Sequence, residues 1–275
     1  MTEYERVVIS RSTTDDLSYT HTTNKNASSD VFEYHTHDRF EIIFLIKGEM
    51  QYISEGRCYD LEVGDLILTR PSVFHVMMPK CVTNYERYDA IINEKLISKS
   101  IRDRIPKMRE VFKCAGNERI FDLFSKLDHY YGKFTADEYA HVTFNIIEEV
   151  LYNLAIIEEE DERGTVNPLI AKATSYIKEN LTTIRQIEEV SDALYITKSH
   201  LHHLFTKDLH MTPAKYILSK RMLKAQKMIH RGEKPTAVYI KCGFDDYATF
   251  FRNYKKYFGY PPSAAAEIEI TREII

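Results

Sequence analysis

The pattern of hydrophobic and polar positions changes twice along the chain. Between Val31 and Met78, short runs rich in β-branched and aromatic residues are separated by Gly, Asp and Ser, which predicts strands joined by tight turns. Gly56 and Gly64 stand where hairpin turns favour a positive φ. The segment therefore predicts an antiparallel barrel or sandwich, with strands in VFEYH, FEIIFLIKG, EMQYIS, RCYDL, GDLILT and FHVMM.

From about Glu94 onward, apolar residues recur at spacings of three and four, which predicts amphipathic helices in FDLFSKLDHYY and EYAHVTFNIIEEVLYNLAII. Two explanations fit the wide apolar stripe of the second helix: it docks on the chain's own barrel, or it pairs with a second copy. We expect the segment 139–157 to pair with its symmetry mate in a homodimer. The stripe comprises Val142, Ile146, Ile147, Val150, Leu151, Leu154 and Ile157.

The acidic, Gly- and Pro-containing segment EEEDERGTVNP predicts a solvated linker. Beyond it, Pro168 opens a helix, and two short helices follow in IEEVSDAL and TKSHLHHLFTKDL. The long helix AKYILSKRMLKAQKMIHRG is ended by Gly232. The short pair then recurs at an offset of 48, which predicts two helix-turn-helix motifs joined by a long helix. The matching positions are Val190 and Val238, Leu194 and Cys242, and Ile196 and Phe244.

Composition narrows the class of protein. The 275 residues are 44% hydrophobic and 28% charged, enough for two globular domains. No apolar run approaches the ~20 residues that span a bilayer, and the first residues carry charges where a signal peptide would be apolar. The four cysteines show no paired spacing. We predict a cytoplasmic protein without membrane contact or disulfides.

Charge is distributed unevenly along the chain. Residues 1–165 hold 20 Lys and Arg against 30 Asp and Glu, giving −10, whereas residues 166–262 hold 16 against 8, giving +8. An acidic half joined to a basic half predicts a polyanion partner for the basic half. Double-stranded DNA is the leading candidate.

The second helix of a helix-turn-helix motif needs one apolar face to dock on its domain and one polar face to contact bases and phosphates. Both copies meet this requirement, with Leu201, Leu204 and Phe205 predicted to face inward in the first, and Phe250 and Tyr254 in the second. The predicted DNA-binding residues are Lys198, Ser199, His202, His203 and Lys207 in the first copy, and Tyr247, Arg252, Asn253, Lys255 and Lys256 in the second.

From Pro168 to Ser263 the chain resembles the AraC/XylS class of bacterial transcription factors. The segments that carry the resemblance are IAKATSYI, FTKDLHMTPAKYI, RMLKA, CGFDDYATFFRNYKKYFG and PPS. Tyr195 departs from the family's usual turn Gly, Tyr239 from its Ala and His203 from its frequent Arg. The resemblance implies activation more often than repression, carbohydrate use as a common regulated process, and RNA polymerase as a protein partner.

The N-terminal half contains His35, His37 and Glu41 in an HxHxxxE pattern, followed by His75. The pattern resembles the metal-binding cupin barrels, and imidazoles with one carboxylate suit Zn, Mn, Fe or Ni. Regulators of the resembled class commonly carry the pattern without needing a metal, and Arg70 and Ser72 replace the usual Pro and Gly of the later cupin motif. We therefore predict that the four residues bind a small polar effector, with no metal or other cofactor. Ile43, Leu45 and Tyr52 are the candidate apolar walls.

Taken together, the sequence predicts an α+β chain: a cupin-like antiparallel barrel at 1–92, a helical connector and linker at 93–165, a tandem helix-turn-helix domain at 166–263 and a tail at 264–275. We predict a ligand-responsive transcription regulator without catalytic residues. A cupin metalloenzyme, either a dioxygenase or an isomerase, with a helical assembly domain is the main alternative. A ligand-independent structural DNA-binding protein is a third.

Overall fold

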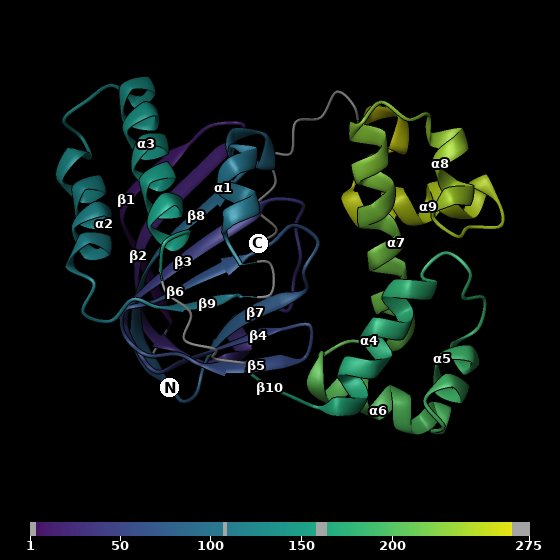
Figure 1. Cartoon of the computed structure of the whole chain (residues 1–275). Helices are drawn as coiled ribbons and strands as arrows, with labels where there is room; N and C mark the ends of the chain where they lie inside the picture. The colour runs from purple at the N-terminus through teal and green to yellow at the C-terminus, as the bar shows by residue number, and fades with distance from the viewer. Residues whose placement is uncertain (1–3, 107–108, 158–163, 266–275) are drawn as a thin grey trace. The chain divides into compact units, whose positions relative to one another are not determined.

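The computed structural model describes residues 4–106, 109–157 and 164–265 (Figure 1). These form two compact units, one of residues 1–54 with 58–164 and one of residues 55–57 with 165–275. The first is built on antiparallel sheets and the second on helices, so the predicted α+β class is confirmed. The acidic run of the predicted linker and most of the predicted tail lie outside the described residues. The four-part domain division remains a prediction.

The first unit contains a large sheet in which every neighbouring pair of strands is antiparallel. Its order is β1 (Glu5–Thr13), β2 (Leu17–Ala27), β8 (Thr83–Ile92), β3 (Phe40–Lys47), β6 (Asp65–Thr69) and β9 (Val111–Lys113). A second sheet holds, in order, β5 (Arg57–Asp60), β4 (Met50–Ser54) and β7 (His75–Pro79). The short helices η1 (Ser29–Val31), η2 (Glu94–Leu96) and α1 (Lys99–Arg104) lie in connections.

The predicted strands from Phe40 onward are present, but VFEYH is not a strand. Its last residue, His35, makes one isolated bridge to His75, while Val31 ends the short helix η1. The hydrophobic pattern also misses β1, β2 and β8. These strands are rich in Thr, Ser, Asn and charged residues, so a search for apolar runs passes over them.

The two faces of the large sheet differ. Alternate side chains of a strand point to opposite faces, and in β3 Ile42 and Phe44 join the apolar cluster that includes the helices α2 (Glu118–Tyr130) and α3 (Ala136–Leu154). Ile43 and Leu45 join the other cluster, together with Tyr52 of the second sheet. One face thus carries the helices, and the other lines the space between the two sheets.

The apolar stripe of α3 corrects one prediction. Leu151 is 1% exposed and Leu154 is fully buried, in the same cluster as Phe44 and Leu127. Figure 1 shows α2 and α3 side by side against the large sheet. The expectation that these leucines meet a second copy is therefore wrong, because the chain's own sheet and α2 already remove them from water.

The helical unit follows the predicted pattern. After the two-residue strand β10 (Thr165–Val166), its elements are α4 (Pro168–Asn180), α5 (Ile187–Ala193), α6 (Lys198–Asp208), α7 (Pro213–His230), α8 (Pro235–Lys241), α9 (Tyr247–Phe258) and η3 (Pro262–Ala264). In Figure 1, α4, α5 and α6 surround the first half of α7, and α8 and α9 lie at its other end. Thr197, Thr212 and Asp246 cap their helices by accepting a backbone N–H bond.

Each helix-turn-helix copy has its own buried core. Val190, Leu201 and Phe205 are fully buried in the first copy. In the second, Val238, Phe250 and Tyr254 are fully buried and cluster with Met222 and Ile229 of α7. The long helix therefore supplies apolar side chains that support the second copy. Among the described residues, every helix is too short or too polar to cross a membrane.

Candidate effector site and DNA-binding helices

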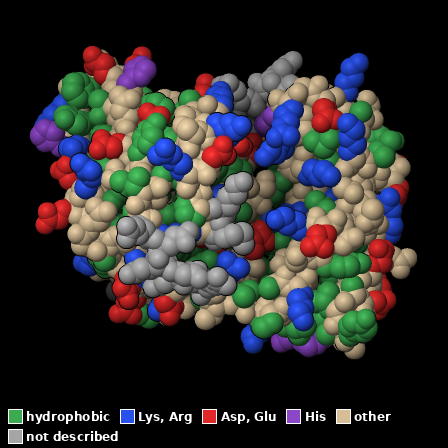
Figure 2. Space-filling view, in the orientation of Figure 1, with side chains coloured by type: hydrophobic (Ala, Val, Ile, Leu, Met, Phe, Trp, Pro, Cys, Tyr) green, Lys and Arg blue, Asp and Glu red, His purple; other side chains and the backbone are tan. Residues whose placement is uncertain are grey.

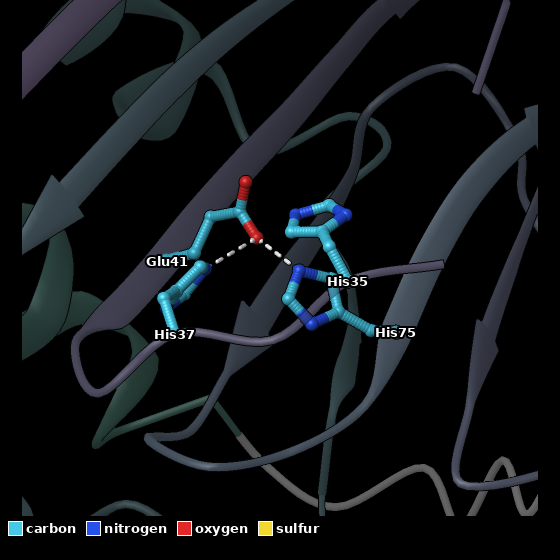
Figure 3. A group of neighbouring side chains, drawn as sticks. All are labelled: His35, His37, Glu41 and His75. Atoms are coloured by element: carbon cyan, nitrogen blue, oxygen red, sulfur yellow. Dashed lines mark hydrogen bonds and ion pairs between the residues drawn. The ribbon is translucent and has the colours of Figure 1, made fainter. Parts of the chain in front are cut away.

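His35, His37, Glu41 and His75 come together in the first unit (Figure 3). Glu41 lies near the start of β3 and His75 begins β7, while His35 and His37 lie in the segment that leads into β3. One ligand atom from each residue lies within 4.8 Å of the others. The structure thus brings the four predicted residues into one cluster, and their role as an effector site remains a prediction.

The Glu41 carboxylate is the centre of the cluster. Its Oε2 lies 2.6 Å from His75 Nε2 and 3.4 Å from His37 Nε2. The Nδ1 of each histidine donates to a backbone carbonyl two residues away, at 2.9 Å for His37 and 3.0 Å for His35 and His75. Because a carbonyl only accepts, these bonds orient the rings and leave Nε2 as the atom available to other partners.

Burial and neighbouring charges shift the protonation of the cluster in different directions. Burial lowers the pKa of His35 to about 4, with His75 adding to the effect. Burial also opposes protonation of His37, but its bond to Glu41 outweighs this and raises the pKa of His37. Burial would raise the pKa of Glu41, yet the nearby His75 and His37 hold it well below its usual value. The cluster combines a neutral imidazole with an ionised carboxylate.

Three imidazoles and one carboxylate within this distance are a donor set that fits Zn, Mn, Fe or Ni. The same groups fit the hydroxyls of a small polar molecule, because they offer both hydrogen-bond donors and acceptors. The donor set therefore fits either kind of ligand, and metal-free function of the cluster stays a prediction.

The predicted walls lie on the face of the large sheet that meets the second sheet. Ile43, Leu45 and Tyr52 are buried in one apolar cluster. The Tyr52 hydroxyl lies 2.8 Å from Thr69 Oγ1, so its polar end is satisfied inside the barrel. These three side chains therefore face the space between the two sheets, as the sequence predicts.

A largely buried ion pair lies on the same face and was not predicted from the sequence. Arg87 Nη2 lies 2.8 Å from Asp89 Oδ2 in β8. Burial raises the pKa of Asp89 to about 6, although Arg87 opposes the shift. A signal was present, because Tyr85, Arg87 and Asp89 alternate with residues of the helix-covered face. The hydrophobic pattern does not predict β8 as a strand, so it does not predict this alternation either.

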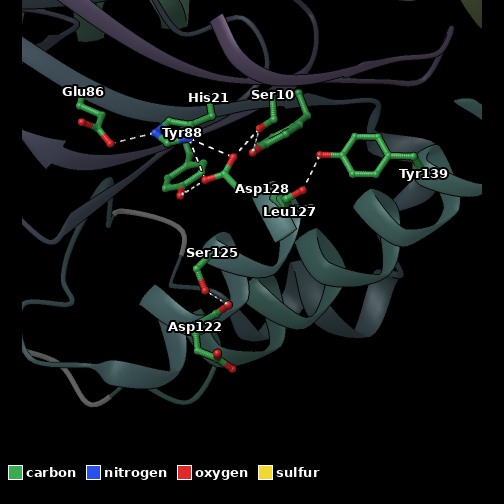
Figure 4. Close-up of polar contacts among 10 residues, drawn as sticks. Ser10, His21, Glu86, Tyr88, Asp122, Ser125, Leu127, Asp128 and Tyr139 are labelled. Atoms are coloured by element: carbon green, nitrogen blue, oxygen red, sulfur yellow. Dashed lines mark hydrogen bonds and ion pairs between the residues drawn. The ribbon is translucent and has the colours of Figure 1, made fainter. Parts of the chain in front are cut away.

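A second polar cluster lies on the helix-covered face (Figure 4). The Asp128 carboxylate of α2 accepts hydrogen bonds from Ser10 at 2.5 Å and Tyr88 at 2.6 Å, and lies 2.9 Å from His21 Nδ1. His21 Nε2 lies 3.0 Å from Glu86. These groups satisfy one another, so the cluster fixes α2 against β1, β2 and β8.

The structure places most of the predicted DNA-binding residues on exposed helix faces. Lys198, Ser199, His202, His203 and Lys207 of α6 are exposed, as are Arg252, Lys255 and Lys256 of α9. Figure 2 shows Lys and Arg side chains at several places on the surface of the helical unit.

Four of these residues also have partners within the helical unit, among them Arg252, whose Nη2 donates to Thr249 Oγ1 at 3.1 Å. Tyr247 is half-buried against Phe250, with ring centroids 5.9 Å apart, so it is less available than predicted. The half-buried Asn253 donates to the Thr249 carbonyl at 2.8 Å, and Lys198 Nζ lies 2.6 Å from Glu188. A base or phosphate would have to compete with these contacts.

The two copies align at an offset of 48 through the turn and of 49 in the second helix. The N-caps Thr197 and Asp246 correspond at 49, as do the buried Phe205 and Tyr254. At this offset the exposed His203 matches Arg252 and Lys207 matches Lys256. The second copy contains one extra residue between its helices, which the single offset predicted from the sequence did not include.

Comparisons with known proteins agree with this architecture. Residues 23–80 match the model of the AraC-like ligand binding domain, and residues 190–267 match a helix-turn-helix domain. The Msm operon regulatory protein of Streptococcus mutans is 23% identical over 246 residues, covering 82% of this chain and 83% of the relative. The lactose operon transcription activator of Staphylococcus xylosus is 24% identical over 238 residues, with the same coverage. The multiple antibiotic resistance protein MarA of Salmonella typhimurium is 31% identical over 101 residues, or 36% of this chain and 80% of the relative.

Proposed function

The chain belongs to the AraC/XylS family of transcription regulators, and on that premise we propose how it works. α6 and α9 contact successive major-groove segments of one DNA duplex, and a small polar effector binds at His35, His37, Glu41 and His75. Effector binding changes transcription, with activation as the proposed sign because a relative is named an activator.

One observation carries the DNA-binding part of the proposal. Both α6 and α9 are second helices of helix-turn-helix motifs, buried on one face and exposed with basic residues on the other. They belong to a segment with a net charge of +8. Such helices enter the major groove, where one turn of duplex is about 10 base pairs. We therefore expect protected segments at that spacing.

The experiment is a binding titration of full-length protein with DNA from upstream of its own and neighbouring genes. Because Lys and Arg displace counterions from phosphates, log K should fall linearly as log salt rises. The variant Lys207→Ala with Lys256→Ala should reduce the slope by about 2, at ~1 per phosphate contact. A matched control replaces Lys126 and Lys133, lysines of the sheet-containing unit, and should leave the slope unchanged. Absence of binding at low salt would contradict the proposal.

The metalloenzyme alternative gains no support from the comparisons, whose named relatives are regulators. We propose that the chain is not an enzyme and resides in the cytoplasm with RNA polymerase as a partner. Turnover of a substrate by protein that does not bind DNA would favour the alternative instead.

We also retain a homodimer through α3 as a proposal, but with different residues. Tyr152, in the last turn of this helix, is 48% exposed, and Ile156, two residues beyond its end, is 68% exposed, so both are available to a second copy. Sedimentation of Tyr152→Asp with Ile156→Asp should show a folded monomer where the unmodified chain is a dimer. A dimer that persists in this variant would exclude the contact.

A further inference from the structure

Three segments that are distant in sequence meet at one junction inside the helical unit. They are the connection between α4 and α5 at 181–186, Arg221 in the middle of α7, and the turn between α8 and α9 at 242–246. The connection leads into the first helix-turn-helix copy, and the turn belongs to the second copy. The junction therefore joins the two copies at a place other than along α7.

Arg221 contacts both sides of the junction. Its Nε donates to the Leu181 carbonyl at 2.9 Å, and its Nη2 donates to the Ile184 carbonyl. A guanidinium holds its donors in a rigid fork, so bonds to two carbonyls of one loop orient both the loop and the side chain. The same guanidinium lies over the ring of Phe244 in the second copy, with Cζ 5.8 Å from the ring centroid.

Arg185 closes the junction from the connection. Its Nη1 donates to the Thr182 carbonyl at 3.3 Å and to the Gly243 carbonyl at 3.1 Å. Its Nε lies 3.5 Å from Asp245 Oδ1, in the same turn of the second copy. Because a Cβ on Gly243 would lie 2.8 Å from the Thr182 carbonyl oxygen, the backbones of the turn and the connection are also in close contact.

Stability alone does not explain why this junction contains two arginines. Burial lowers the pKa of Arg221, and the nearby Arg185 lowers it further. Two cations side by side repel each other, and well-packed apolar side chains are often at least as stable as buried charged groups. What forked, charged hydrogen bonds add to apolar packing is a defined direction. The pair therefore indicates that one fixed arrangement of the two copies is required.

A second attachment matters because each copy packs on its own part of α7. Phe205 of the first copy packs on Tyr216, with ring centroids 5.5 Å apart, whereas the second copy clusters with Met222 and Ile229. Relative motion is the ordinary behaviour of two bodies that share a small interface. Contacts along one helix give little leverage against rotation about that helix. The junction lies beside α7, so it opposes such a rotation.

We propose that Arg185 and Arg221 hold the two copies as one rigid body, and that this sets the spacing of the two DNA segments that the chain accepts in one duplex. The inference rests on the proposed function in taking α6 and α9 as the helices that contact DNA. It adds two positioning residues, which act on DNA through α6 and α9.

The test first selects a duplex from a random DNA library with full-length protein, and footprinting locates the two protected segments. A second duplex carries one extra base pair between them, which shifts one segment by about 3.4 Å and turns it by about 35°. Anisotropy gives the ratio of the two dissociation constants. The unmodified chain should bind the longer duplex at least ten-fold more weakly. In Arg185→Met with Arg221→Met, the ratio should fall to three-fold or less.

This ratio separates positioning from other roles. A smaller folded fraction, or the loss of a direct phosphate contact, weakens binding to both duplexes equally and leaves the ratio unchanged. Arg221→Lys keeps the charge but not the fork, so it should also lower the ratio. The matched control, Lys178→Met with Lys224→Met, removes the same amount of charge from exposed residues of α4 and α7 and should keep the ratio.

The side chain of Arg185 is half exposed, so Arg185→Met alone tests the inference if the double variant does not fold. The inference is overturned if the unmodified chain binds both duplexes equally, if the arginine variants keep its ratio, or if the lysine control lowers the ratio as much. Each of these results leaves DNA binding intact and contradicts this inference alone. If the unmodified chain selects no duplex at low salt, the proposed function fails as well.

Discussion

The two helix-turn-helix copies are built alike inside but differ at their turns and on their exposed faces. In the second copy the turn contains Gly243, which is buried, whereas the equivalent residue of the first copy is Tyr195, 96% exposed. Both have left-handed backbone, with φ of 83° and 57°. Tyr195 adopts this conformation at a cost in local backbone strain, but its side chain extends into solvent, so packing adds no further penalty.

Gly243 has no such freedom. A Cβ built on it would lie 2.8 Å from the Thr182 carbonyl oxygen and 2.9 Å from Thr182 Cα. Arg185 Nη1 of the same connection, between α4 and α5, donates to the Gly243 carbonyl at 3.1 Å. The turn of the second copy thus packs against the α4–α5 connection, which leads into the first copy, while the turn of the first copy faces water. Equivalent positions in a repeat are therefore subject to different constraints.

The largest expected effect is from Gly243→Ala. It adds a methyl group in contact with backbone and imposes left-handed strain on a non-glycine residue, so we expect at least ~2 kcal/mol of destabilisation. Denaturant unfolding followed by circular dichroism would measure it. Gly232→Ala is the matched control, because its φ is 89° and nothing lies within 4 Å of the added Cβ. Equal losses in the two variants would show that the contact with Thr182 is unimportant.

Next in size is the loss of Arg252, on the exposed face of α9. Arg252→Ala should weaken DNA binding by about 1–3 kcal/mol if the guanidinium contacts a base with two hydrogen bonds. His203→Ala, at the equivalent position of α6, should weaken it less. Anisotropy titrations of both variants at one salt concentration would compare them. An equal or greater loss from His203→Ala would show that the first copy dominates.

Making the two equivalent positions, His203 and Arg252, identical should strengthen DNA binding. His203→Arg gives α6 the residue that α9 has at this position, and a guanidinium is always charged and can bond two acceptors. We expect binding to strengthen by about 1 kcal/mol, with a steeper dependence on salt. His129→Arg, on an exposed residue of α2 in the other unit, controls for the added charge. Unchanged affinity in His203→Arg would place position 203 away from the duplex.

The smallest effect is expected at the turn of the first copy. Tyr195→Gly relieves left-handed strain of ~1–2 kcal/mol, offset by the greater backbone freedom of glycine in the unfolded chain, so we expect a net stabilisation of about 0.5–1 kcal/mol. Tyr195→Ala keeps the strain and should be nearly neutral. Both are measured by denaturant unfolding. Destabilisation by glycine would mean that the Tyr195 ring makes a contact that stabilises the turn.

Much of the helical unit was predictable from local patterns. Caps, a proline at the first turn of three helices and the spacing of apolar residues act within a few positions, so they locate α4 to α9 and the repeat without knowledge of their packing. Hairpin signals located β3 to β7 in the same way. Likewise, the HxHxxxE pattern and His75 identified residues that do come together.

Other features depend on which surfaces meet in the folded chain. The α3 stripe has the same period whether it docks on a sheet or on a second copy, and only the packing of α2, α3 and the sheet shows that Leu151 and Leu154 are internal. Arg87 and Asp89 are ordinary charged residues in the sequence; their burial beside Glu41 follows from the register of β8 against β2 and β3. Tyr195 and Gly243 likewise differ through contacts made by Thr182, about 60 residues from Gly243. Local patterns identify elements because their causes lie within a few residues, whereas the environment of a side chain is created by segments that are distant in sequence.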